Sequence, residues 1–150
     1  EKGVKFIEVG SGGWDHHHDI YHTFEQQANE LDQALATLIR DLSHRGLLDS
    51  TLVVLATEFG RSPILTPDGG RGHFPKAFSC LLAGGGIRGG QIYGQTSHDG
   101  TEILKNKVSV PDFNATIAHA IGLDVHKVIR SPEGRPFTVT DKGKPITALL

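Results

Sequence analysis

The feature that most constrains the fold is a regular succession of apolar patterns in the first third of the chain. The run 4–9 has the β-branched and aromatic content of a strand. Thr23 and Gln26 then have the spacing of a capping box, and the leucines that follow recur every three or four residues up to Gly46. The continuous apolar run 51–56 is typical of a strand covered on both faces. Together these patterns predict a βαβ unit, in which a right-handed crossover joins two parallel strands.

The rest of the chain is richer in turn residues. The glycine- and proline-rich stretch 62–75 is expected to lack regular structure, and the next strand, 77–83, to run back antiparallel. Later expected elements are a short strand at 91–93, a helix over 111–122 and a small hairpin over 137–144.

Composition limits the class of protein. A length of 150 residues with 37% hydrophobic content predicts one domain over 1–150. The 15 basic and 17 acidic residues give a net charge of −2 without a basic block, so nucleic acid is not an expected partner. No apolar run approaches the roughly 18 residues of a membrane span. The single cysteine, Cys80, excludes an internal disulfide and a cysteine-based zinc site, and its apolar neighbours predict that it is buried.

Three consecutive histidines between two aspartates, residues 15–19, form the densest group of potential metal ligands. They follow the first predicted strand, and ligands of open α/β sheets bind beyond the carboxyl ends of strands. A tag remnant is a poor explanation, because the triplet is internal and flanked by aspartates. A solvated polar loop remains the alternative to metal binding.

A second group of polar residues follows the second predicted strand. Parallel strands that end at Gly10 and Thr57 would deliver Asp15 and Glu58 to the same edge of the sheet. Arg61, close behind, has the guanidinium fork that clamps an anionic group. A helix cap or a salt bridge with Arg61 is the alternative role for Glu58.

His73 lies in the glycine-rich excursion, and it reaches Asp15 and His17 if that excursion stays over the same edge. A surface position is the alternative. One carboxylate and two imidazoles suit zinc, manganese or iron better than calcium or magnesium, and zinc or manganese is the expected cofactor. A facial triad of a non-haem iron oxygenase has the same ligand types, but the βαβ pattern argues against the β-barrel of those enzymes.

Several motifs, taken together and in this order, resemble the DUF1501 family, which looks like a branch of the alkaline phosphatase/sulfatase superfamily. The motifs are Gly13–His17, Arg45–Asp49, Thr51–Val54, Thr57–Arg61, Gly72–Pro75 and Leu82–Gly86. The resemblance covers nearly the whole chain and corresponds to the family's C-terminal part. It implies an α/β fold, a partial alkaline phosphatase-like sandwich in which a βαβ unit and a mixed sheet are flanked by helices.

The resemblance also implies roles for single residues. Asp15, His17 and His73 would ligate one metal ion, and Glu58 stands where the superfamily places an acidic ligand of a second. The usual Asp-His-Gly of that second site reads Glu-Phe-Gly over 58–60, so an imidazole ligand is missing.

The implied function of the full-length protein is hydrolysis of a small phosphate or sulfate ester, with Arg61 steadying the anion. The superfamily's nucleophile lies on an N-terminal strand outside this chain, so the chain alone is expected to be inactive. A non-catalytic metal-binding or interaction module is the alternative. An open sheet edge would favour a homo-oligomer, and the resemblance implies export to the bacterial periplasm.

Overall fold

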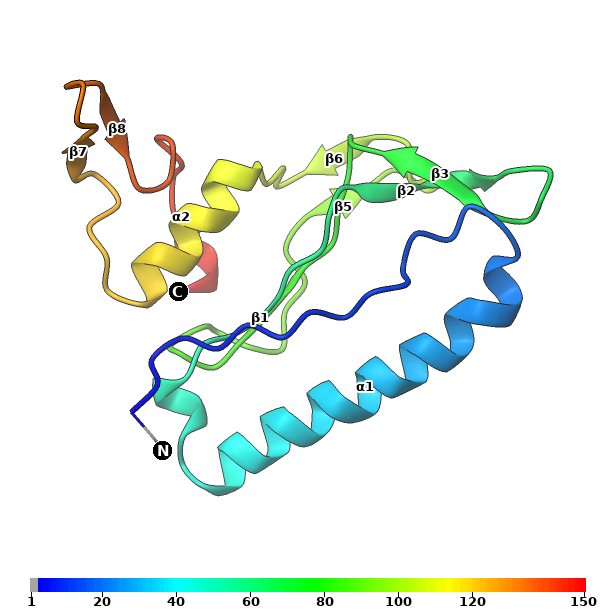
Figure 1. Cartoon of the computed structure of the whole chain (residues 1–150), viewed down its shortest axis with the longest axis horizontal. Coiled ribbons are helices and arrows are strands. Elements are labelled where there is room, and N and C mark those ends of the chain that lie inside the picture. The colour runs from blue at the N-terminus through cyan, green and yellow to red at the C-terminus, as the bar shows by residue number, and fades with distance from the viewer. Residues whose placement is uncertain (1–2) are drawn as a thin grey trace.

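The structure is a computed structural model and describes residues 3–150. It is a mixed α and β fold whose eight strands form four separate two-stranded antiparallel sheets (Figure 1). The helices are α1 (Ile20–His44), α2 (Val110–Ala120) and two short 3₁₀ turns, Leu48–Ser50 and Thr147–Leu149. The strands are β1 (Val53–Leu55), β2 (Gly60–Leu65), β3 (Arg71–Phe74), β4 (Leu81–Ala83), β5 (Gln95–Thr96), β6 (Ile103–Lys105), β7 (Val128–Arg130) and β8 (Pro136–Thr138).

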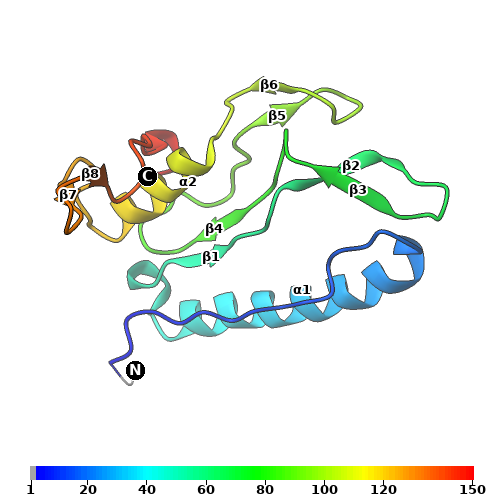
Figure 2. The same ribbon diagram turned by 45° about the horizontal axis from the view of Figure 1, so that its top comes forward.

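The predicted parallel βαβ unit is wrong for the described residues. Residues 4–9 belong to no strand, and Phe6 and Val9 are 79% and 86% exposed. This segment runs beside α1, while β1 pairs antiparallel with β4, Val53 opposite Ala83 (Figures 1 and 2). A parallel sheet needs helices that cover its faces, and α1 has no buried residue with which to cover one. The antiparallel return of the strand after residue 77 is confirmed.

Helix α1 begins earlier than its capping pattern predicts. The helix starts at Ile20, and Thr23 Oγ1 donates to the backbone oxygen of Asp19 rather than capping the helix. The reason is tertiary, because the Asp19 and Ile20 amides donate to the backbone oxygens of Asp68 and Gly69 in the β2–β3 turn. Docking to that turn therefore sets the start of the helix.

The predicted end of α1 is confirmed. Gly46 has a φ of +66°, and its amide donates to Ser43 O while the amide of Leu47 donates to Leu42 O. This pair of bonds is the Schellman arrangement, which favours glycine at the left-handed position.

The stretch predicted to be irregular is instead a β-hairpin. Strands β2 and β3 pair Gly60 with Phe74 and Arg61 with His73, and the register shifts between Arg61 and Leu65. Pro63 lies inside this shifted region, where a missing backbone N–H is tolerated. The hairpin places Arg61 and His73 directly opposite each other, which is what positions the site described below.

The segment 143–146 lies against α2. Ser109 and Asp112 form a capping box at its start, and Gly122 ends it at a φ of +81°. Ala115, Ala118 and Val125 form the buried core cluster of the described residues. The predicted helix over 111–122 is thus confirmed in type and in place.

Two smaller predictions and one burial prediction are wrong. Residues 91–93 form no strand, and the short strand lies at β5 instead. The hairpin predicted over 137–144 is instead formed by β7 and β8. Strand β8 pairs with β7, which precedes it, because the turn that contains Gly134 folds the chain back after β7. Cys80 is only half-buried. Within residues 3–150, no helix combines the length and the apolar character needed to cross a membrane.

Candidate metal centre

The first histidine of the triplet, His16, anchors its loop to α1. His16 is 8% exposed, and its Nδ1 lies 3.0 Å from the backbone oxygen of Trp14. Its Nε2 lies 2.7 Å from Oε1 of Gln27 on α1. The imidazole also packs edge-on against the rings of Trp14 and Phe24. With His16 turned inward, His17 and Asp15 are left at the surface of the loop.

The β2–β3 hairpin holds the other side of the same loop. The amide of Arg71 donates to His16 O at 2.9 Å, and His18 forms a bridge with Gly69. Gly70 is buried so closely against the loop that a Cβ there would lie 1.9 Å from the backbone oxygen of His17. Only glycine permits this approach, and it brings His17 beside β3.

Three side chains from these two segments meet at one point. His17 Nε2 lies 3.0 Å from Asp15 Oδ1 and 3.1 Å from His73 Nε2, and His73 Nε2 lies 3.3 Å from the same Asp15 oxygen. His73 is 58 residues from Asp15 in the sequence, so the fold brings the ligands together. The ring of His73 packs on Phe59 at a centroid distance of 4.6 Å, which orients the imidazole.

These separations match those between ligands that share one ion. Ligands about 2.0–2.1 Å from a tetrahedral zinc lie about 3.3 Å from one another. The three ligand atoms of Asp15, His17 and His73 all lie within 4.8 Å of one another. Among residues 3–150, this is the one group of three or more His, Cys, Asp or Glu side chains whose ligand atoms lie close enough to share a metal ion. The spacing and the chemical types of these three residues therefore fit a single divalent ion.

Arg61 and Glu58 border the trio. Arg61 Nη1 donates to Asp15 Oδ1, and its Nη2 lies 3.3 Å from Glu58 Oε2. The hydrogen bond from Arg61, with smaller contributions from His73 and the charge of His17, lowers the pKa of Asp15 below its ordinary value, so the carboxylate is ionised near neutral pH. The guanidinium carbon of Arg61 also lies 5.7 Å from the ring centroid of Phe59.

The structure brings together most of the residues predicted for the site, although by another route. Asp15, His17 and His73 converge, and Arg61 joins them as a partner of Asp15. Glu58 is not one of the three and contacts Arg61 instead. The route is a loop docked on a hairpin, not the edge of a parallel sheet. His18, which the resemblance treats as a neighbour, points to Asp68 at 3.7 Å. Of the supporting residues, Trp14 lies within the motif Gly13–His17, whereas Phe24 and Gln27 carry no signal in the sequence that links them to a site.

A search against protein families matches residues 1–150 to the family described as "Protein of unknown function (DUF1501)". The chain belongs to the DUF1501 family. The match confirms the family that the sequence motifs resemble, and its description names no reaction. Searches of curated proteins and of solved structures found no match.

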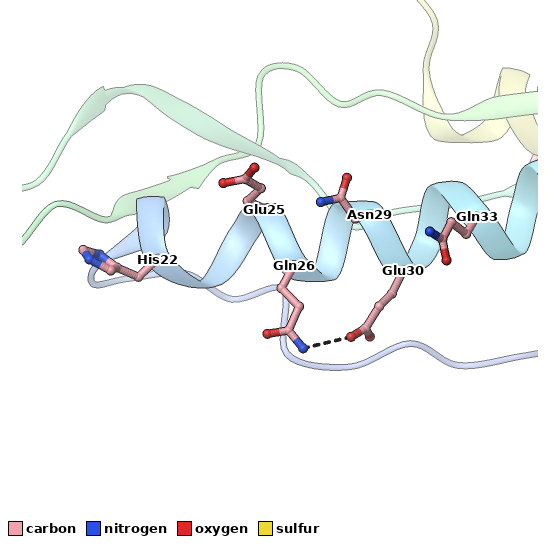
Figure 3. A pocket seen from close by; sticks show the side chains of 6 residues that line it. All are labelled: His22, Glu25, Gln26, Asn29, Glu30 and Gln33. Carbon is pink, nitrogen blue, oxygen red and sulfur yellow. Dashed lines mark hydrogen bonds between the residues drawn. The ribbon is translucent and has the colours of Figure 1, made fainter.

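The surface of this DUF1501 chain is hollowed beside the trio. A cavity of about 450 Å³ is lined by Asp15, His17 and residues from the first turns of α1. It adjoins a second hollow of about 400 Å³ along α1, with which it shares three lining residues, and Figure 3 shows the polar side chains that line this second hollow. They are His22, Glu25, Gln26, Asn29, Glu30 and Gln33. No lysine or arginine lines either hollow. Among the described residues, Arg61 is the cation nearest the trio, because its guanidinium contacts Asp15 directly.

Proposed function

We propose that this DUF1501 chain binds one divalent metal ion, zinc or manganese, through Asp15, His17 and His73. The observation that carries the proposal is the convergence of three ligand atoms, from two segments far apart in sequence, at the spacing of a shared ion. Three protein ligands leave a coordination position for water or a substrate, as in catalytic zinc sites.

The proposed chemistry, in a protein that also contains the nucleophile-bearing part of an alkaline phosphatase-like sandwich, is hydrolysis of a small phosphate or sulfate ester. If an ion is bound there, the chemistry it would supply is Lewis-acid polarisation of the ester. Asp15, His17 and His73 hold and orient the ion, and Phe59 fixes the ring of His73. Arg61 offers N–H groups that pair with anionic oxygens, as guanidinium groups commonly do.

Calorimetric titration of metal-stripped protein with zinc and with manganese tests the metal site. The native chain should bind one ion, and Asp15→Asn and His73→Ala should each weaken binding by at least tenfold. His18→Ala is the matched control, because it removes an exposed histidine from the same triplet and leaves the trio intact. Binding that survives His73→Ala but falls in His18→Ala would show that the triplet is only an adventitious chelator.

A non-catalytic metal-binding module is the second candidate, and one observation favours it. The guanidinium of Arg61 already lies between two carboxylates, those of Asp15 and Glu58, so it is largely neutralised. An ester-hydrolysis assay separates the two candidate functions. It uses a protein that includes the family's N-terminal part, with p-nitrophenyl phosphate and p-nitrophenyl sulfate as substrates. Metal-dependent release of p-nitrophenol that is lost in Asp15→Asn supports the hydrolase. No release from either ester by the metal-loaded protein supports the module.

A further inference from the structure

The position of Arg61 gives the proposed site a feature beyond its three ligands. Three nitrogen atoms surround a single oxygen, Asp15 Oδ1: Nη1 of Arg61 and the Nε2 atoms of His17 and His73. An ion held by both imidazoles and by this oxygen therefore shares its oxygen ligand with a permanent positive charge. Arginine does not lose its proton in proteins, so the competition persists at every working pH.

Glu58 provides the other partner of the same guanidinium. Arg61 Nη2 lies 3.3 Å from Glu58 Oε2, and the Arg61 side chain is 22% exposed while that of Glu58 is 69% exposed. The half-buried guanidinium thus lies between the carboxylate that would bind the ion and a carboxylate outside the trio. An approaching cation repels the guanidinium, and Glu58 is the partner that remains for it.

We propose that Arg61 and Glu58 form a counter-charge pair that sets the metal affinity of the site: Arg61 competes with the ion for Asp15, and Glu58 strengthens ion binding by drawing Arg61 away. The inference rests on the proposed metal site. It assigns Glu58 a positioning role through Arg61 in place of the ligand role expected from the family resemblance. It also predicts that removing the charge of Arg61 raises the metal affinity, whereas removing the charge of Glu58 lowers it.

Zinc affinities of metal-stripped variants, measured by calorimetry at low ionic strength, test this pair. Arg61→Ala should bind zinc on the order of tenfold more tightly than the native chain, which is the size of effect that one neighbouring charge has on the proton affinity of a carboxylate. Glu58→Gln should bind zinc several-fold more weakly. Arg61→Lys, which keeps the charge, should lie closer to the native chain than Arg61→Ala does.

The double variant and a distant control complete the experiment. If Glu58 acts through Arg61, Glu58→Gln should have little effect when it is added to Arg61→Ala. Arg40→Ala removes a charge of the same sign about 30 Å along α1 from the start of the helix at Ile20. This variant should leave the zinc affinity unchanged. Circular dichroism identifies any variant that fails to fold, and if Arg61→Ala fails, Arg61→Gln, which removes the charge but keeps a polar side chain, replaces it in the single and double variants.

The outcomes separate this inference from the metal site itself. A native chain that binds no zinc would contradict the proposed function. A native chain that binds zinc, with unchanged or weaker binding in Arg61→Ala, would overturn the counter-charge pair alone. Weaker binding in Glu58→Gln that persists in full in the double variant would show that Glu58 acts on the ion directly and not through Arg61, and would also overturn the pair.

Discussion

At the scale of single residues, the candidate site depends on one close backbone contact. Gly70 lies against the backbone of His17 with no room for a Cβ, while the adjacent Arg71 amide binds the carbonyl of His16. These contacts hold a loop that carries two ligands against a hairpin that carries the third, His73. The residue types of the ligands could be read from the sequence, but this docking could not, since it is a steric fit between segments more than 50 residues apart.

Substitution of Gly70 tests that contact. Gly70→Ala should displace His17 and weaken zinc binding at least tenfold, because the new Cβ would lie 1.9 Å from a backbone oxygen that cannot move without moving the loop. Gly72→Ala on β3 is the matched control, since a Cβ there meets nothing within 4 Å. Calorimetry with zinc measures both. Equal binding by the two alanine variants would contradict the assigned role of Gly70.

Thr116 tests a second residue-scale contact, away from the site. Its side chain is fully buried, and its hydroxyl donates to Asp112 O at 2.7 Å while accepting from the amide of Ile146 at 2.9 Å. Thr116→Val keeps the shape but leaves the Ile146 amide unpaired, which should cost about 1–3 kcal/mol of unfolding free energy. Thr37→Val, at an exposed position of α1, should change stability by less than about 0.5 kcal/mol. Urea unfolding that gave equal losses would contradict this assignment.

At the scale of elements, local patterns succeeded where tertiary contacts did not intervene. The helix α2 and both glycine stops, Gly46 and Gly122, follow from rules that act within a few residues. The start of α1 did not follow its capping pattern, because docking on the β2–β3 turn outweighs a cap that contributes about 1 kcal/mol. Local patterns do not predict the hairpin over 60–74, because its glycines and prolines favour irregular structure while the strands form through pairing across the turn.

The capping box of α2 gives a prediction for pH. The amide of Lys144 and the hydroxyl of Ser109 donate to the Asp112 carboxylate and lower its pKa below the ordinary value of 3.8. Because the pKa is lower in the folded state, this stabilisation is fully present above about pH 4 and is lost as the pH falls through the folded value. Asp112→Asn should therefore melt at a lower temperature at pH 7, and the difference from the native chain should shrink below about pH 4.

Thermal unfolding followed by circular dichroism across pH 2.5–7 measures this effect. The native chain has other carboxylates with lowered pKa values, such as Asp99 and Glu133, so the comparison between variants isolates Asp112. Asp32→Asn, at an exposed position of α1, is the control and should follow the native profile. A difference between Asp112→Asn and the native chain that is constant over the whole range would contradict the assigned pairing.

At the scale of the whole molecule, the described chain exposes an unusually large surface. Its accessible area is 11210 Å², about one and a half times the roughly 7,500 Å² expected of a compact protein of 16 kDa. The apolar side chains of Val4, Phe6, Ile7 and Val9 contribute to this area. The predicted βαβ unit failed at this scale, because a strand pattern states which residues favour an extended backbone but not which edge they pair with.

Hydrogen exchange measures how far that open surface persists in solution. Amides in the exposed segment 4–9 should exchange rapidly, while those in the second and third turns of α2, which carry Ala115 and Ala118 of the buried core cluster, should be the most protected. Mass spectrometry of peptic peptides after short labelling times gives the comparison directly. Protection of 4–9 equal to that of α2 would contradict the unpaired state of this segment and would favour the homo-oligomer predicted from an open sheet edge.

The central claim is that Asp15, His17 and His73 hold one ion together. Zinc X-ray absorption spectroscopy of the loaded protein tests it most directly, because imidazole ligands give a distinct outer-shell scattering that can be counted. We expect two imidazoles and oxygen ligands in the native chain, one imidazole in His73→Ala if any zinc is retained, and an unchanged spectrum in His18→Ala. Three imidazoles in the native chain, or a spectrum that does not change in His73→Ala, would contradict the account.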